Sequence, residues 1–240
     1  MPETRQEQLR LAYGNTELDY TLLRANRKTL AVEVHPDLSI VVKAPQETEF
    51  PIIEKALLNK ARWIVKQQAF FETFLPQTPP REYVSGETHL YLGKRYILHV
   101  KESEAISVKL SGGYLQVNTN RKKSDTQFVK RLLAQWYKSH AERVFTKRLN
   151  LCLPLFKKYD LTIPALEIRR MPKRWGSYTP KGKILLNPEL IKAPTKCIDY
   201  VLIHELCHAV YPNHNKKFYQ LQEALNPGWD KWKISLERLI

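Results

Sequence analysis

The feature that most constrains this chain is a pair of histidines on an apolar helix near its C-terminal end. Apolar residues recur at helical spacing from Thr195 to Val210, and Pro212 stops the helix. His204 and His208 are four residues apart, so their imidazoles leave the same face of the helix, one turn apart. That spacing suits two ligands of a tetrahedral zinc ion. We therefore expect a buried helix that presents polar groups for a metal inside a core.

Glu205 lies next to the first of these histidines, where its carboxylate can hydrogen-bond a metal-bound water without binding the metal. In metallopeptidases with this arrangement the glutamate is the general base. The surrounding helix positions are apolar: Ile198, Val201, Leu202, Ile203, Leu206, Ala209 and Val210. An unpaired glutamate is costly to bury among such residues, which argues against a chance motif. The sequence thus predicts one zinc ion as cofactor and Glu205 as the catalytic residue.

A catalytic zinc site needs a third protein ligand, and the sequence offers two candidates. His214 lies beyond the helix stop at Pro212, where the chain can turn and bring the imidazole back. Its ten-residue offset from His204 is that of the metzincin pattern, although Tyr211 stands where that pattern has a turn glycine. The other candidate is the carboxylate of Glu223 on the next helix, as in gluzincins. We favour His214, because three-histidine sites are common, and keep Glu223 as the alternative.

The chain is strongly basic, with 39 Lys and Arg against 24 Asp and Glu and a formal net charge of +15. Such an excess attracts anions, so a nucleotide or a nucleic acid is expected as substrate or scaffold. Part of the charge flanks the predicted metal site in the sequence. The candidate substrate-binding residues are Arg170, Lys173, Arg174, Trp175, Tyr178 and Lys217. The sequence contains no recognised nucleic-acid-binding motif, and its aromatic residues do not alternate with basic ones along an obvious strand.

The sequence also bears on the compartment. Its N-terminal segment is polar and lacks the apolar stretch of a secretory signal, and no apolar run reaches the ~20 residues that span a bilayer. Cys152, Cys197 and Cys207 are odd in number and lack paired spacing, which disfavours a disulfide framework. These features predict a cytoplasmic protein that does not enter a membrane.

The hydrophobic pattern predicts an α+β fold in two domains. The N-terminal domain, residues 1–122, is expected to be rich in antiparallel strands and to contain one long helix; the C-terminal domain, residues 123–240, is expected to be mainly helical with a small sheet. The expected strands are 19–24, 29–35, 38–43, 89–98 (a hairpin), 106–110, 114–118, 166–170 and 184–187. The expected helices are 47–75, 124–149, 195–210, 214–225 and 229–239. The sequence shows no internal repeat.

The motifs around the histidine pair resemble those of the YgjP-type metallopeptidase-like family and, more distantly, of the WLM and SprT groups. The matching segments are Arg174-Trp175-Gly176-Ser177, Lys183-Ile184-Leu185-Leu186-Asn187, Asp199-Tyr200-Val201, His204-Glu205-Leu206-Cys207-His208, Asn213-His214 and Phe218, with Asn26-Arg27-Lys28-Thr29-Leu30 and Val41-Val42-Lys43-Ala44-Pro45 in the opening strands. The resemblance covers residues 17–239. It fails at Tyr178, because the family usually has a cysteine after Trp-Gly-Ser; no ligand or redox role of that cysteine is carried over.

The resemblance implies a zincin-like hydrolase domain in which His204, His208 and His214 bind zinc and Glu205 is the base. We favour a metallopeptidase. Members of the family have also been described as UTP pyrophosphatases, so a metal-dependent nucleoside triphosphate pyrophosphatase acting at the same site is the alternative. A second alternative, which rests on the excess of positive charge, is a nucleic-acid-associated protein with a non-catalytic zinc. The related WLM and SprT groups are associated with proteolysis near DNA.

Overall fold

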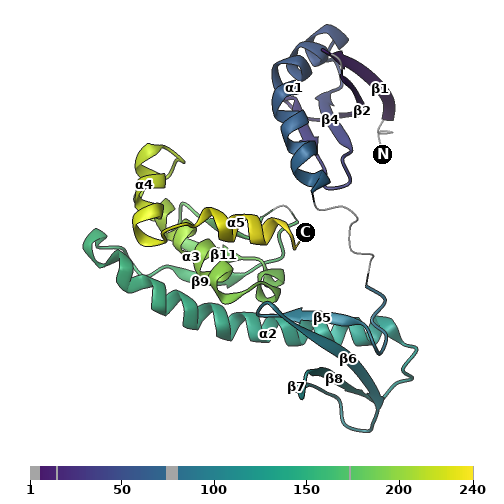
Figure 1. The fold of residues 1–240 in the computed structure, drawn as a ribbon, viewed down its shortest axis with the longest axis vertical. Helices are drawn as coiled ribbons and strands as arrows, with labels where there is room; N and C mark the ends of the chain where they lie inside the picture. Colours follow the sequence, from purple (N-terminus) through teal and green to yellow (C-terminus); the bar gives the residue numbers. More distant parts are fainter. Residues whose placement is uncertain (1–5, 15, 74–80, 173, 240) are drawn as a thin grey trace. The chain divides into compact units, whose positions relative to one another are not determined.

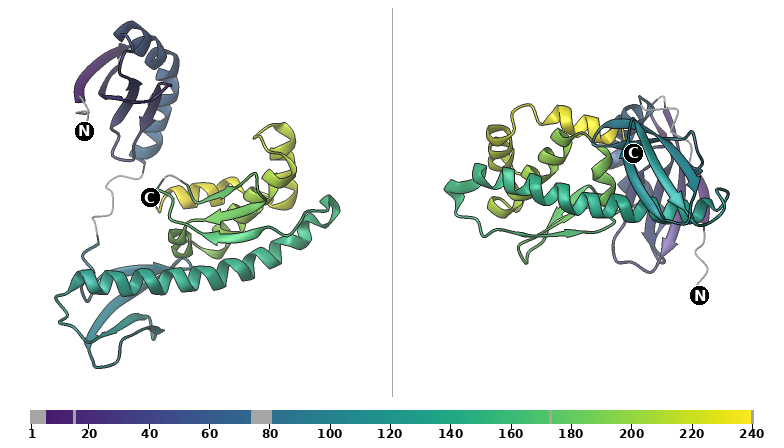
Figure 2. Two further views of the ribbon diagram at one scale, coloured as in Figure 1. Left: turned by 180° about the vertical axis from the view of Figure 1, so that it is seen from behind. Right: turned by 90° about the horizontal axis from the view of Figure 1, so that it is seen from below.

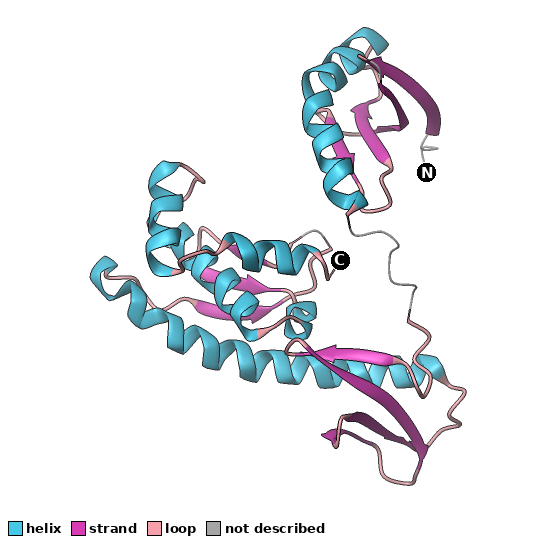
Figure 3. Ribbon diagram, in the orientation of Figure 1, coloured by secondary structure: helices cyan, strands magenta, loops and turns pink. Residues whose placement is uncertain are grey.

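The computed structural model describes residues 6–14, 16–73, 81–172 and 174–239. The chain divides into two compact units, Met1–Pro79 and Pro80–Ile240, each with its own cluster of buried hydrophobic side chains. Both units combine helices with strands (Figure 3), which confirms the predicted α+β class. No helix in the described part of the chain combines the length and apolar character that a bilayer crossing requires.

The first unit is a four-stranded sheet covered on one face by a helix (Figure 1). Its strands are β1 (Gln6–Tyr13), β2 (Thr16–Ala25), β3 (Ala31–Val34) and β4 (Ile40–Pro45), in the order β1-β2-β4-β3, and its helix is α1 (Phe50–Glu72). Alternate strand positions and one helix face supply the core: Leu18, Tyr20, Leu22, Ile40, Val42, Ala44, Ile53, Leu57, Ala61 and Ile64. The period of two in the strands and of 3.6 in the helix places these side chains in one layer.

The second unit opens with the same arrangement of elements. Strands β5 (Thr88–Tyr91), β6 (Lys94–Glu102), β7 (Ser107–Ser111) and β8 (Tyr114–Thr119) pair in the order β5-β6-β8-β7 and are followed by α2 (Thr126–Cys152). In both sheets the fourth strand lies parallel to the second, as β4 does to β2 and β8 to β6. The chain therefore contains a structural repeat of four strands and a helix. The prediction of no internal repeat is corrected; the two copies share a strand order rather than a sequence motif.

The remaining elements of the second unit are η1 (Leu153–Tyr159), β9 (Ala165–Ile168), β10 (Gly176–Tyr178), β11 (Lys183–Leu186), η2 (Pro188–Lys192), α3 (Thr195–Val210), α4 (Lys216–Leu225) and α5 (Asp230–Glu237). The central strand β11 pairs antiparallel with β10 and parallel with β9. Helix α3 packs against α2, α4, α5 and β10 (Figure 2), so it is buried on almost every side.

Long helix α2 joins the two halves of the second unit into one core. Val129 in its early turns belongs to the same buried cluster as Val117 of β8, and Phe145 in its later turns to the same cluster as Leu206 of α3. The domain boundary expected after residue 122 lies inside this unit, whereas the division between compact units falls between Pro79 and Pro80. A cut before α2 would remove the helix that covers the β5–β8 sheet.

Most predicted elements lie within a few residues of their expected bounds, and the differences have physical causes. Strand β1 is mostly polar because it is an edge strand with only alternate residues facing the core, and β10 has only three residues. Each sheet contains one parallel pair of strands, so the expectation of purely antiparallel sheets is corrected. Hydrophobic alternation predicts which face of a sheet a residue takes, but not which strands become neighbours. Cys152, Cys197 and Cys207 are free and buried.

An ion pair fixes α2 against α3. The guanidinium of Arg148 donates from Nε to Oδ1 of Asp199 at 2.6 Å and from a terminal nitrogen to Oδ2 at 2.5 Å. The side chain of Asp199 is 11% exposed, and the side chain of Arg148 is 27% exposed. Because the carboxylate is largely out of water, it depends on this bidentate partner.

We expect Arg148→Met to lower the free energy of unfolding by about 2–4 kcal/mol, because it leaves a mostly buried carboxylate unpaired. The matched control is Lys147→Met, an exposed neighbour on the same helix, which should change stability by about 0.5 kcal/mol or less. Urea unfolding followed by circular dichroism measures both variants. Equal midpoints for the two would contradict the role given to the ion pair.

Candidate metal centre

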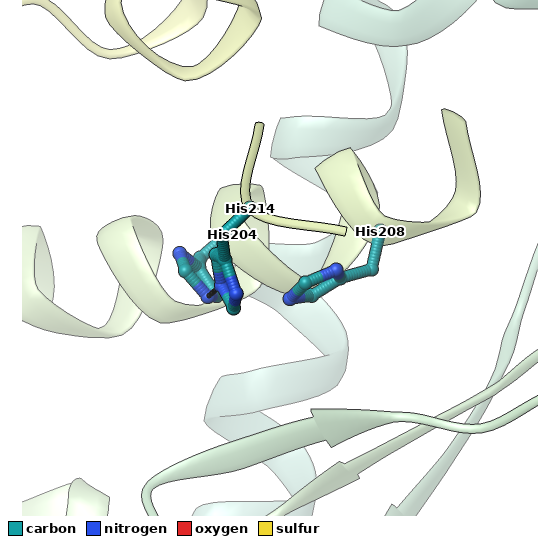
Figure 4. A group of neighbouring side chains, drawn as sticks. All are labelled: His204, His208 and His214. Atoms are coloured by element: carbon teal, nitrogen blue, oxygen red, sulfur yellow. Dashed lines mark hydrogen bonds between the residues drawn. The ribbon is translucent and has the colours of Figure 1, made fainter. Parts of the chain in front are cut away.

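Three histidines converge where α3 ends and α4 begins. One nitrogen each from His204, His208 and His214 lie within 4.8 Å of one another, and the Nε2 atoms of His204 and His214 are 3.0 Å apart. Figure 4 shows His204 and His208 extending from α3, while His214 comes from the loop that follows it. Two nitrogens bound at ~2.1 Å to one tetrahedral zinc ion lie about 3.4 Å apart, so the cluster has the dimensions of such a site.

The turn that returns His214 to the helix needs no glycine. Tyr211 ends α3 in an extended conformation with φ −129° and ψ 102°, which any residue can adopt. Asn215 then begins α4, because its side-chain oxygen accepts a hydrogen bond from the backbone N–H of Phe218 at 3.0 Å. The absence of the metzincin turn glycine at Tyr211 is therefore compatible with the observed loop.

Hydrogen bonds fix which nitrogen of each helix histidine is free. Nδ1 of His204 lies 3.0 Å from Oε1 of Gln222, and Nδ1 of His208 lies 3.1 Å from the carbonyl oxygen of Pro212. Both partners can only accept, so each Nδ1 carries the proton and each Nε2 keeps its lone pair. Metal-binding histidines are usually oriented in this way by an outer acceptor. The donor set therefore fits a zinc ion.

The three imidazoles share an apolar neighbour, the ring of Phe218. The ring of Phe218 lies 5.0, 4.7 and 4.7 Å from the rings of His204, His208 and His214, and Tyr219 stacks on His214. Burial lowers the pKa of His204 to about 4 and also lowers the pKa of His214; the charges of His208 and Lys233 act on both in the same direction. The lowered pKa values favour the unprotonated form of His204 and His214, which is the form that binds metals.

Glu205 is buried beside the histidine pair, on the face of α3 that meets β10. Burial raises its pKa to about 7, while a backbone hydrogen bond from Tyr178 and the charge of Arg174 lower it. Gly176 allows this approach, because a Cβ there would lie 2.8 Å from Oε1 of Glu205 and 2.8 Å from a methyl carbon of Val201. The glycine of the Trp-Gly-Ser motif thus makes room for the carboxylate.

The loop before β10 is held by Asn187. Its amide nitrogen donates to the carbonyl oxygens of Met171 at 2.7 Å and Arg174 at 3.1 Å, and its amide oxygen accepts from the N–H of Glu189. The backbone N–H of Asn187 also donates to the carbonyl of Trp175. Asn187 therefore places the basic loop and the start of β10 relative to β11.

The structure separates the predicted substrate-binding residues. Arg174 and Tyr178 interact with Glu205, as described, whereas Trp175 is half-buried and packs against the hydrophobic core. Arg170 is exposed. Burial raises the pKa of Tyr83, and the charge of Arg170 has a smaller effect in the opposite direction. Lys217 is exposed in the first turn of α4, and Lys173 lies outside the described residues.

The alternative third ligand, Glu223, is not part of the histidine cluster. It is exposed, and its Oε1 accepts a hydrogen bond from the backbone N–H of Gly228 at 3.1 Å. Its neighbour Gln222 is the buried residue that contacts His204, and it was not among the predicted site residues. A polar residue on the otherwise apolar face of α4, with Phe218 and Leu221, was the available signal.

Residues 28–239 match the YgjP-like metallopeptidase domain family. Among curated proteins, none matches this chain. Two solved structures of metallopeptidase zymogens are similar to 39% of this chain. For abylysin of Pyrococcus abyssi the match covers 90% of that chain at 21% identity, with a TM-score of 0.35. For jannalysin of Methanocaldococcus jannaschii it covers 91% of that chain at 22% identity, with a TM-score of 0.33. The family match includes the histidine cluster, Glu205 and most of the chain, so this protein belongs to the YgjP-like metallopeptidase domain family.

Proposed function

We propose that the protein is a zinc-dependent metallopeptidase with Glu205 as its general base. The observation that carries the proposal is the convergence of three imidazole nitrogens within 4.8 Å, with the buried carboxylate of Glu205 on the helix that bears His204 and His208. Three protein ligands leave a fourth position for water or substrate, as in catalytic zinc sites. Membership of a metallopeptidase family supports the reaction class.

Each residue of the site has a distinct task. Zinc held by His204, His208 and His214 would lower the pKa of a water molecule toward ~7 and polarise a carbonyl oxygen. Glu205 accepts a proton from the attacking water and delivers it to the leaving amine. Its raised pKa suits both steps, since a carboxyl that holds its proton near neutral pH can also release it. The contact with Gly176 and the backbone hydrogen bond from Tyr178 limit the orientations of the carboxylate.

A peptide suits this site better than a nucleoside triphosphate. Phosphoryl transfer depends on cations that converge on the phosphates. Of the predicted basic substrate-binding residues that the structure describes, only Arg174 affects the pKa of Glu205, whereas the charge of Arg170 affects the pKa of Tyr83. Among the strands of the described residues, β10 pairs only with β11, so its other edge can pair with an extended peptide beside Glu205. The pyrophosphatase alternative has no support in the family match, which is to a metallopeptidase domain.

We expect Glu205→Gln to retain zinc and to cut an unstructured protein such as casein about 10³-fold more slowly, because only the proton acceptor is removed. The matched control is Glu223→Gln, which changes an exposed carboxylate on α4 and should keep full activity. Peptide release and zinc content are measured on the same samples. Full activity of Glu205→Gln, or Glu205-dependent release of pyrophosphate from nucleoside triphosphates without cleavage of protein, would contradict the proposal.

Gln222→Leu is expected to weaken zinc binding about 10–100-fold, because His204 loses the acceptor that fixes its Nδ1 proton. Gln222→Glu supplies an acceptor at the same place and should restore most of the affinity. The control is Gln220→Leu, an exposed position on the same helix. Competition against a chromophoric chelator measures all three affinities. Equal zinc affinities of Gln222→Leu and Gln220→Leu would contradict a role of Gln222 in orienting His204.

A further inference from the structure

The excess positive charge belongs to one unit. Residues 1–79 contain ten Lys and Arg and ten Asp and Glu, so the whole formal charge of +15 falls on residues 80–240. At the metal centre, the charge of Arg174 acts on Glu205 and that of Lys233 acts on His204 and His214. The remaining cations of the second unit therefore need a different explanation.

The outer face of the β5–β8 sheet concentrates cations and rings. One face of this sheet is covered by α2, and the strand register assigns every second residue to the opposite face. The outward positions of the central and β7 strands are Arg95, Ile97, His99, Lys101, Ser107, Lys109, Ser111, Tyr114, Gln116 and Asn118, and none of them is acidic. No ion pair joins Arg95, Lys101 or Lys109 to a carboxylate of the described residues. The nearby Glu102 belongs by its strand position to the opposite face, and its carboxylate accepts a hydrogen bond from the backbone N–H of Lys123.

The first unit provides an internal comparison, since its sheet has the same strand order and the same helix cover. Its outer face also carries basic residues, but they are neutralised: Arg10 pairs with Glu17 and Asp19 at 2.8 and 2.7 Å, and Lys43 pairs with Glu33 at 3.1 Å. The outward positions of its described strands include no aromatic residue. The unpaired cations and exposed rings are thus specific to the second sheet and are not a consequence of the topology.

Two rings lie side by side among these cations. Tyr114 on β8 is 44% exposed, and its ring centroid lies 6.1 Å from that of His99 on the neighbouring strand β6. Ile97 pairs directly with Tyr114 and is also exposed, at 45%. A flat ring on an open sheet face can stack on a base, and nearby lysines and arginines can contact the phosphates on either side.

We propose that the outer face of the β5–β8 sheet binds single-stranded nucleic acid. Bases stack on Tyr114 and His99, and Arg95, Lys101 and Lys109 contact the backbone phosphates. Gln116 and Asn118 supply donors and acceptors for base edges on the same face. A duplex hides its base faces and would gain only the phosphate contacts, so the face favours single strands. This interaction does not depend on the hydrolytic activity proposed for the histidine site.

The test uses the full chain and fluorescein-labelled oligonucleotides of about 12 nucleotides, oligo-dT and oligo-U, in anisotropy titrations. We expect log Kobs to fall with log salt concentration with a slope of about −2, as three phosphate contacts require for single strands. Tyr114→Ala should weaken binding about tenfold or more, and Tyr114→Phe should restore it, because stacking needs the ring and not the hydroxyl. Replacing Arg95, Lys101 and Lys109 together by Gln should abolish the salt dependence.

Two controls separate this face from nonspecific charge. Lys43→Gln, on the equivalent face of the first unit, should leave binding unchanged, and Tyr114→Ala should leave hydrolysis at the histidine site unchanged. A duplex of the same length and a polyglutamate of the same charge should bind at least tenfold more weakly than oligo-dT. Equal binding of polyglutamate or duplex, or wild-type affinity of either Tyr114→Ala or the triple Gln variant, would overturn the proposal. Circular dichroism melting of each variant confirms that it is folded.

Discussion

The central constraint in this structure is the need to bring the imidazole of His214, from the loop after α3, close to those of His204 and His208 on this buried helix. Each helix histidine is oriented by an acceptor that comes from outside α3, Gln222 for His204 and the carbonyl of Pro212 for His208. These acceptors follow the helix in the sequence, so the turn after Tyr211 and helix α4 are as necessary to the site as the histidines. Phe218 then closes the apolar side of the cluster.

The rest of the second unit supports α3 from its other sides. Arg148 pairs with Asp199 and connects the helix to α2. Gly176 brings β10 against Glu205, and Asn187 ties the loop before β10 to the end of β11. Residues far apart in the sequence therefore meet around a single helix, which explains how motif segments as distant as Gly176 and Phe218 contribute to one site.

The sequence predicted the parts of the site that depend on local periodicity. The spacing of His204 and His208, the apolar character of α3 and the stop at Pro212 are visible in the order of residues, and from them the bounds of the helix and the shared face of the two histidines were predicted. The contributions of Gln222, Asn187 and Gly176 depend on which elements meet in space, so residue type alone did not reveal them. The parallel strand pairs and the structural repeat were missed for the same reason, because alternation fixes which face a residue takes but not its neighbouring strand.

The central claim, that His204, His208 and His214 form one zinc site, is tested most directly by X-ray absorption spectroscopy of the zinc-loaded protein. The account predicts three imidazole nitrogens and one oxygen at about 2.0–2.1 Å, and the loss of one imidazole shell in His214→Ala with no change in Glu223→Gln. A spectrum with two imidazoles and a carboxylate that disappears in Glu223→Gln, while His214→Ala keeps the wild-type spectrum, would contradict it.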